Sequence, residues 1–471
     1  MDQPLRIEGA LPMARAVAAP PDPAMSPRTR QLLEAPIAST LLRLAAPNAV
    51  VLVVQAALNI LEAYFVGALG PEALAGIALT FPLVMLMQTM SAGGMGGGVA
   101  SAVARALGAG RRRDADALVF HAVVIALGMG AVFTTGMLIA GPVIFRAMGG
   151  TGGALAAALA YSNVVFTGAV AFWLFNILAA VIRGTGNMAL PAATTVIGAV
   201  VVATLSPSLI FGWGPFPPLG MRGAAIALVV YYVLGTLVFA GYLLSARSLA
   251  RLSLRGVRMR RDRFAEILRV GAPASLNTIQ TNLTVVVLTG LVGPFGTFAI
   301  AGYGMGARLE YLQIPLVFAI GSALVTMVGT NVGAGHAARA RRITWIGAGM
   351  AAGLTEAIGL AAALFPSAWL GLFTNEPEVL AAGTAYLRIV GPTYGFFGLG
   401  LALYFASQGV GRLLWPLLAG LARMIVAAVM GWMAVHWIGT LPALFVAIAL
   451  ALVVFGTTLA AAIQFRLPVK E

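Results

Sequence analysis

The sequence predicts an all-α integral membrane protein of 12 transmembrane helices, arranged as two similar six-helix bundles. Three observations lead to this prediction. The composition is that of a lipid-embedded chain, the apolar runs number six in each half, and the second half repeats the first. Two related hydrophobic halves are typical of membrane transporters, which place their binding site between the repeats.

The composition excludes an ordinary soluble protein. Of the 471 residues, 60% are hydrophobic and only 9% are charged, and the mean hydropathy is +0.95. Soluble domains carry about 25% charged residues. A chain of this length can hold about a dozen spanning helices of roughly 20 residues, together with short loops.

The repeat becomes visible when the chain is shifted by about 226 positions onto itself. VGALGPEALAG (66–76) then falls on VGPFGTFAIAG (292–302), GAG (108–110) on GAG (333–335) after the loss of one residue, and RGTGNMALP (183–191) on QGVGRLLWP (408–416). Six helices in each half insert both halves the same way up. The repeats are therefore parallel, with their symmetry axis along the membrane normal.

Apolar runs predict the helices in order. The first half has runs at 41–68, 74–106, 117–141, 154–181, 189–211 and 222–245. The second half has runs at 267–291, 298–331, 343–366, 379–407, 413–437 and 441–465. The runs 74–106 and 298–331 exceed the hydrocarbon thickness, so they must tilt or project from the bilayer.

Arginines mark the side to which the helices exit. Each even-numbered helix is followed by a basic segment, at 111–113, 183, 247–263, 336–342, 412 and 466–470. Odd-numbered helices exit to acidic or neutral loops, apart from Arg146 and Arg222. The positive-inside rule therefore predicts a multi-pass protein of the cell inner membrane with both termini in the cytoplasm.

This pattern divides the chain into four parts. Residues 1–36 are rich in proline, contain no long apolar core and predict a disordered cytoplasmic tail rather than a signal peptide. Residues 37–246 form the first bundle, 247–266 a basic cytoplasmic linker and 267–466 the second bundle.

Composition and spacing also exclude several functions. The net charge of +14 resides in loops that orient a membrane protein, so no nucleic-acid partner is expected. The chain has no cysteine, and its three histidines lack metal-ligand spacing, so neither a metal nor a cofactor is expected. No Ser/His pair or His/Asp cluster lies within the spans, which disfavours an intramembrane enzyme.

One face of the first helix is polar. Asn48, Gln55, Asn59 and Glu62 are spaced so that they lie on the same side of the helix. A charge at the bilayer centre costs about 3 kcal/mol, so Glu62 should face a cavity or a partner. We interpret this face as part of a binding cleft and Glu62 as a coupling group. The alternative is a hydrogen-bonded seam between helices.

Further polar groups lie on helices 7 and 8. Glu310 shares a helix face with Gln313, and Asn277, Gln280 and Thr284 share a face of helix 7. We predict that Glu310 is a second coupling carboxyl and that the other four line the cleft. A buried ion pair, or polar contacts between helices, would explain the same residues. The run GGMGGG (93–98) lies inside helix 2 and indicates close helix packing or flexing.

At this point the chain resembles the MATE (multidrug and toxic compound extrusion) family from about residue 41 to 425. The resemblance rests on NILEAYFVGALGPEALAG, ARALGAG, RGTGN, SLIFGWGPFPPLGMRGAAIA, RLEYLQIP and VGTNVGAG, which occur in order at the family's spacing. It implies two bundles that form a V around a central cleft. It also implies export of cationic or amphiphilic compounds in exchange for protons or sodium ions.

The family's acidic residues match only in part. The helix 1 acid, usually Asp, corresponds to Glu62, and Glu310 matches a helix 8 acid common in bacterial members. The helix 5 acid and the Asn before it correspond to Ser206 and Val202. Glu62, Asn59 and Ser206 would offer a sodium ion few oxygens, which favours protons as the coupling ion.

The sequence therefore predicts a secondary active multidrug exporter that works by alternating access, as a monomer in the lipid bilayer, on small organic cations or amphiphiles. A flippase for lipid-linked precursors is the main alternative. Such a protein needs an arginine-rich cleft, and only Arg308 and Arg388 are predicted to lie clearly inside spans. A passive channel is a further alternative, which uphill transport on a proton gradient would exclude.

Overall fold

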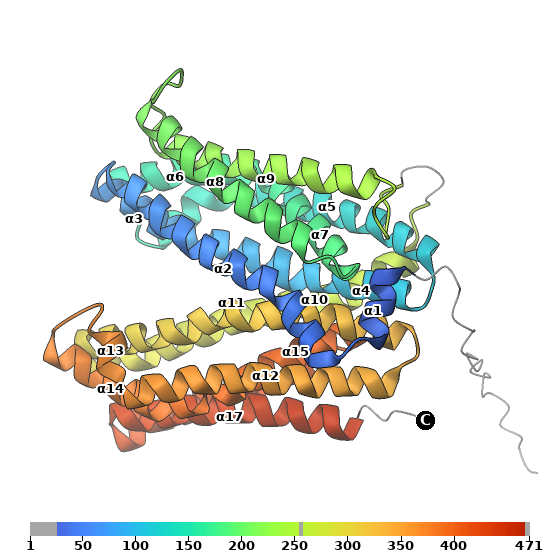
Figure 1. Cartoon of the computed structure of the whole chain (residues 1–471). Coiled ribbons are helices and arrows are strands. Elements are labelled where there is room, and N and C mark those ends of the chain that lie inside the picture. Colours follow the sequence, from blue (N-terminus) through green and yellow to red (C-terminus); the bar gives the residue numbers. More distant parts are fainter. Residues whose placement is uncertain (1–25, 254–257, 467–471) are drawn as a thin grey trace, which may run out of the picture.

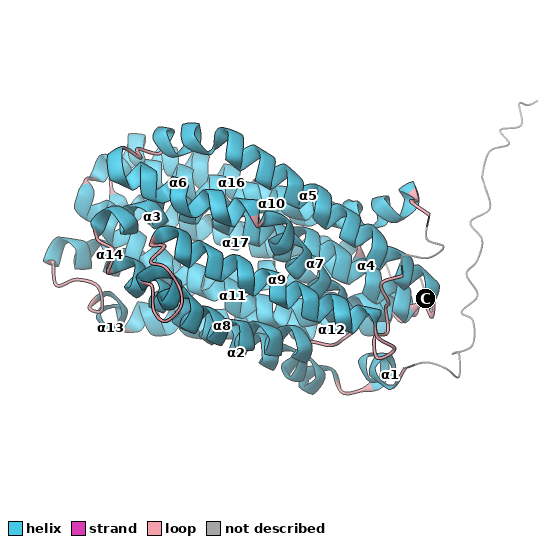
Figure 2. Cartoon of the chain, turned by 90° about the horizontal axis from the view of Figure 1, so that it is seen from above, coloured by secondary structure: helices cyan, strands magenta, loops and turns pink. Residues whose placement is uncertain are grey.

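The structure is a computed structural model that describes residues 26–253 and 258–466. In these residues the chain is helical, with no strand. Figure 2 shows helices throughout, joined by short loops. The predicted all-α class is confirmed. Residues 1–25 of the predicted tail and 254–257 of the predicted linker lie outside the described residues.

The first half contains six spans in order. Its elements are α2 (Ile37–Gly67), α3 (Pro71–Gln88), η1 (Thr89–Met95), α4 (Gly96–Gly108), α5 (Arg112–Ala147), α6 (Gly152–Thr167), α7 (Ala169–Gly184), α8 (Ala189–Phe211) and α9 (Met221–Leu244). The first three after α2 make one long helix, in which the π-helical turn η1 ends inside the GGMGGG run (93–98). Helices α6 and α7 make one span that bends by 52°.

The second half follows the same plan. Its elements are α10 (Arg261–Val292), η2 (Gly293–Phe295), α11 (Thr297–Gly333), α12 (Ala337–Leu364), α13 (Pro366–Leu370), α14 (Pro377–Val390), η3 (Gly391–Thr393), α15 (Tyr394–Val410), α16 (Leu414–Met433), η4 (Ala434–Ile438) and α17 (Leu441–Arg466). In the described residues, eleven helices are long and apolar enough to cross a membrane, and the bent α6–α7 pair makes up to 12. The predicted spans are confirmed to within a few residues.

The predicted disorder of residues 1–36 is wrong for the short helix α1 (Pro27–Glu34). The Ser26 hydroxyl accepts a hydrogen bond from the Thr29 amide at 3.1 Å, and Pro27 occupies the first turn, where its missing amide is not needed. Leu32 and Leu33 are buried. The proline content of residues 1–36 therefore did not indicate that they include a capped helix, which packs on the rest of the protein.

The predicted linker 247–266 is also too long at its end. Helix α10 begins at Arg261, so residues 261–266 are helical. Asp262 lies in the first turn of this helix, where a negative charge is favourable.

The two halves form a V. Their ribbons meet at the end that carries the basic loops and diverge toward the other end (Figure 1). The larger buried cluster joins residues of both halves, such as Phe172 and Phe405. A second cluster contains only residues of the second half, from Leu288 to Leu452. Of the two clusters in the described residues, one is thus shared by the halves and the other belongs to the second half.

Candidate functional site

Glu62 lies on α2 in the first half and is half-buried. Its Oε1 accepts a hydrogen bond from the hydroxyl of Tyr161 on α6, at 3.2 Å. Tyr161 is itself buried. Among the residues that the structure describes, no basic side chain forms an ion pair with Glu62. Within the described part of the chain, this carboxyl therefore has one neutral side-chain donor and no compensating cation.

The rest of the polar face of α2 divides into two parts. Asn59 and Gln55, one and two turns before Glu62, are exposed. Asn48 is buried and its Nδ2 donates to the Ser322 hydroxyl of α11 at 2.7 Å. Asn48 thus lies in a contact between the halves, whereas Gln55 and Asn59 remain open to a ligand or to water.

Glu310 on α11 has a different environment. Its Oε1 accepts a hydrogen bond from Nη2 of Arg423 on α16 at 2.8 Å, and its Oε2 accepts one from the Tyr386 hydroxyl of α14 at 3.3 Å. The side chains of Arg423 and Glu310 are only 14% and 15% exposed. The Arg423 guanidinium also lies over the rings of Phe397 and Phe455, at 5.2 and 5.7 Å. The negative charge of Glu310 is therefore compensated by the buried Arg423 guanidinium.

Arg423 is the residue that sequence reasoning missed. Arg308 and Arg388 are the arginines predicted to lie clearly inside spans, but both are exposed, while Arg423 lies in the middle of α16. The signal was present, because a single arginine interrupts the apolar run LLAGLARMIVAAV. An intramembrane charge of this kind indicates a partner or a function.

The other predicted cleft residues lie within the second half. Gln313 is buried one turn after Glu310 and donates to the Leu309 carbonyl of its own helix at 3.4 Å. The side-chain oxygens of Asn277 and Gln280 face Gly420 of α16. The Thr284 hydroxyl donates to the Gln280 carbonyl at 3.0 Å. These groups contact their own bundle, and in the described structure the hydrogen bond to Glu62 comes from Tyr161 instead.

The possible sodium ligands are not joined by hydrogen bonds. Ser206 is buried on α8, and its hydroxyl has no partner among the described residues. Asn59 is exposed. Within 26–253 and 258–466, no group of three or more His, Asp or Glu side chains could hold a metal ion.

At the basic end of the V, equivalent residues of the two halves make equivalent contacts that close this end. The Ser101 hydroxyl of α4 donates to the Gln408 carbonyl, and the equivalent Thr326 hydroxyl of α11 donates to the Arg183 carbonyl at 3.0 Å. A Cβ at Gly108 would strike the Thr330 carbonyl, and a Cβ at Gly333 would strike the Arg105 carbonyl. Helices α4 and α11 therefore cross at the symmetry axis through their GAG segments.

The GGMGGG run serves this closure. A Cβ at Gly97 would overlap the Gln408 side chain, and Gln408 Nε2 donates to the Gly93 carbonyl at 3.1 Å. Gly98 lies against the backbone of Gly271 on α10. The glycines thus permit close approach of the second half.

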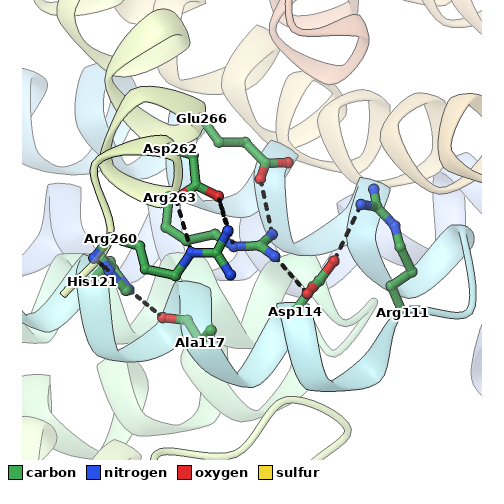
Figure 3. A network of polar contacts seen from close by, with 8 residues as sticks. All are labelled: Arg111, Asp114, Ala117, His121, Arg260, Asp262, Arg263 and Glu266. Atoms are coloured by element: carbon green, nitrogen blue, oxygen red, sulfur yellow. Dashed lines mark hydrogen bonds and ion pairs between the residues drawn. The ribbon is translucent and has the colours of Figure 1, made fainter. Parts of the chain in front are cut away.

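Charges strengthen the same end (Figure 3). Arg263 of α10 pairs with Asp114 of α5 at 2.6 Å, and Asp114 also pairs with Arg111 at 3.1 Å. The Arg260 amide donates to Nε2 of buried His121 at 3.0 Å. Since that nitrogen accepts, His121 is neutral and carries its proton on Nδ1, which donates to Ala117 at 2.7 Å.

Comparison with known proteins agrees with this architecture. The sequence model of the MatE family matches residues 47–207 and 273–433, one segment in each half. The FAD transporter of Shewanella oneidensis is 28% identical over 403 residues, which cover 84% of this chain and 87% of that protein. The probable multidrug resistance protein NorM of Thermotoga maritima is 26% identical, over 84% of this chain and 86% of that protein.

Solved structures have the same fold. An outward-facing multidrug resistance MATE family transporter superposes with a TM-score of 0.84 at 25% identity, and the match covers 93% of this chain and 97% of that one. A MOP superfamily transporter from Pyrococcus furiosus, described as having a binding pocket of reverse polarity, superposes with a TM-score of 0.87 at 25% identity, over 95% and 99% of the two chains.

Proposed function

Because this chain belongs to the MatE family of membrane transporters, we propose that it exports cationic or amphiphilic small molecules in exchange for protons, by alternating access. The observation that carries this proposal is the environment of Glu62, a carboxyl within a span whose hydrogen-bond partner is the neutral Tyr161. Such a group can take up either a proton or a cationic substrate, but not both at once.

The proposed cycle follows from this competition. In the state described here, the ribbons of the two halves diverge at the end away from the basic loops (Figure 1), and we propose that this end is open. A proton that reaches Glu62 from that side removes its charge, and a bound cation loses its counter-charge and leaves. The halves then rock, the proton leaves to the other side and the carboxylate binds the next cation. Glu310 contributes less in this scheme, because Arg423 already compensates its charge.

Protons are favoured over sodium ions by the oxygens available. A sodium ion needs several oxygen ligands, whereas Glu62 accepts its hydrogen bond from Tyr161, Asn59 is exposed and Ser206 is buried without a partner among the described residues. A proton needs only the carboxyl itself.

The basic loops support the proposed orientation. They and α1 lie at the closed end of the V (Figure 1), which the positive-inside rule assigns to the cytoplasm. We therefore propose an inner-membrane location with cytoplasmic termini and an outward-open state. A monomer suffices, since both halves of the site come from one chain.

A second candidate substrate class is an anionic flavin nucleotide. Its support is the relative named as an FAD transporter together with Arg423, a cation inside a span that lies over Phe397 and Phe455. A flavin needs an aromatic contact and its phosphates need a cation. Against this class, Arg423 is already paired with Glu310.

Transport by the purified protein in vesicles separates these possibilities. Export of a fluorescent organic cation and of FAD is measured with a pH gradient, a sodium gradient or neither, and with a protonophore as control. We expect uphill movement of the organic cation driven by the pH gradient alone. Two outcomes would contradict the proposal: transport that only a sodium gradient drives, or a protein that transports FAD but not the organic cation.

A further inference from the structure

Helix α1 contacts both halves of the molecule at the closed end. On the side of the first half, the side chains of Leu32 and Arg28 lie against Gly186, in the segment between α7 and α8. On the side of the second half, Asn331 of α11 donates from Nδ2 to the Leu32 carbonyl at 3.1 Å, and Arg339 of α12 donates to the Ala35 carbonyl.

These contacts complete the end of α1. The last carbonyls of a helix lack partners within the helix. Here the Leu32 and Ala35 carbonyls take theirs from the second half. Asn331 is fully buried, so its amide reaches α1 through a dry contact. The opposite face of α1 carries the exposed pair Arg30–Glu34 at 2.9 Å.

The repeat shows why this contact belongs to the closure. Arg339 is equivalent to Asp114 in the first half. Asp114 binds Arg263, near the start of the first helix of the second half, at 2.6 Å. Arg339 binds Ala35, just before the first helix of the first half. Each half therefore holds the beginning of the other half's first span.

We propose that α1 is a strap that holds the two halves together at the basic end and must detach before the molecule can open on that side. Rocking of the halves separates Gly186 from Asn331 and Arg339, and α1 cannot follow both. The strap thus favours the state that is open at the far end. This inference rests on alternating access, which is part of the proposed function.

The absence of cysteine from the chain makes a direct test practical. Cysteines replace Leu69, just after α2, and Phe298, at the start of α11, both exposed at the far end. Spin labels on this pair report the distance across the open end of the V. We compare the full-length protein with Leu32→Asp, with Arg339→Gln and with the control Arg30→Ala, whose side chain is 71% exposed.

We expect Leu32→Asp and Arg339→Gln to raise the short-distance population by roughly threefold or more, and Arg30→Ala to leave it unchanged. If Leu32→Asp does not fold, Arg339→Gln alone decides. Unchanged distances in the folded variants would overturn the strap. Export is assayed in parallel. If the wild-type protein does not export but the distances still shift in the variants, the proposed function is refuted and the strap is supported.

Discussion

The two halves of the repeat are alike at the closed end of the V and differ at the two carboxyl sites, Glu62 and Glu310. At the closed end, equivalent residues make equivalent contacts: Ser101 and Thr326 each donate to a carbonyl of the opposite half, and Gly108 and Gly333 each lie against the opposite backbone. Two copies that touch across a twofold axis must present self-complementary surfaces. Divergence in one copy there would disturb both sides of the contact.

The carboxyl sites have no such constraint, and they have diverged. Tyr161 and Tyr386 are equivalent, and each donates to a glutamate. The glutamates come from non-equivalent helices, since Glu62 lies on the first span of its half and Glu310 on the second. In the sequence repeat, Leu288 is the residue equivalent to Glu62, and Gly198 is the residue equivalent to Arg423. Duplication therefore preserved the contact between the halves and left two chemically different sites.

The largest effect is expected from Glu62→Gln. It removes the ionisable group from the site that lacks a cation, so proton-driven export should fall to the level of empty vesicles while the protein still inserts. The matched control is Glu310→Gln with Arg423→Met, which removes the second site as a unit and should retain most export. Equal losses in both proteins would show that the asymmetry has no functional meaning.

Arg423→Met should lower stability by about 3 kcal/mol, because it leaves the Glu310 carboxyl buried without its cation. Thermal unfolding in detergent measures this loss. Adding Glu310→Gln should restore most of it, as a double-mutant cycle detects coupling between the two side chains. Additive losses would mean that the pair does not act as a unit.

Alanine at Gly108 or at Gly333 tests the symmetric region. Each Cβ would strike a backbone carbonyl of the opposite half, so each variant should lose about 1–3 kcal/mol. Symmetry predicts that the two losses agree within about 0.5 kcal/mol. Gly349→Ala is the control, because it lies on α12 with open space around its Cβ position. A large difference between Gly108 and Gly333 would reject the axis at this point.

The smallest effects should come from the equivalent tyrosines. Tyr161→Phe removes the one hydrogen bond that Glu62 receives from a side chain in the described chain, worth about 1 kcal/mol. The carboxylate then lacks its hydrogen-bond donor, so the profile of export against external pH should shift. Tyr386→Phe should leave this profile unchanged, because Arg423 still holds Glu310. Identical profiles for both variants would contradict the distinction.

Much of the fold could be predicted from the sequence, because lipid imposes long apolar helices and the duplication shows in the GAG and RGTGN segments. These conspicuous segments are the contacts near the axis, where geometry limits variation. The pairing of Glu310 with Arg423 could not be predicted, since they lie 113 positions apart and no local spacing relates them. Asn48 shares a helix face with Gln55 and Asn59 but lies in a contact with α11, because helical periodicity places residues on a face without showing where another helix crosses it.

The π-helical turn at 89–95 has a consequence for movement. Such a turn winds less tightly than an α turn, and the Gly93 carbonyl in it accepts a hydrogen bond from the Gln408 amide. If the second half withdraws, this hydrogen bond breaks and the turn is free to tighten into regular α-helix. Tightening by one residue rotates the chain beyond it by up to about 100°. Separation of the halves at one end would thus rotate part of the helix formed by α3, η1 and α4 about its axis and present a different set of its side chains at the other end.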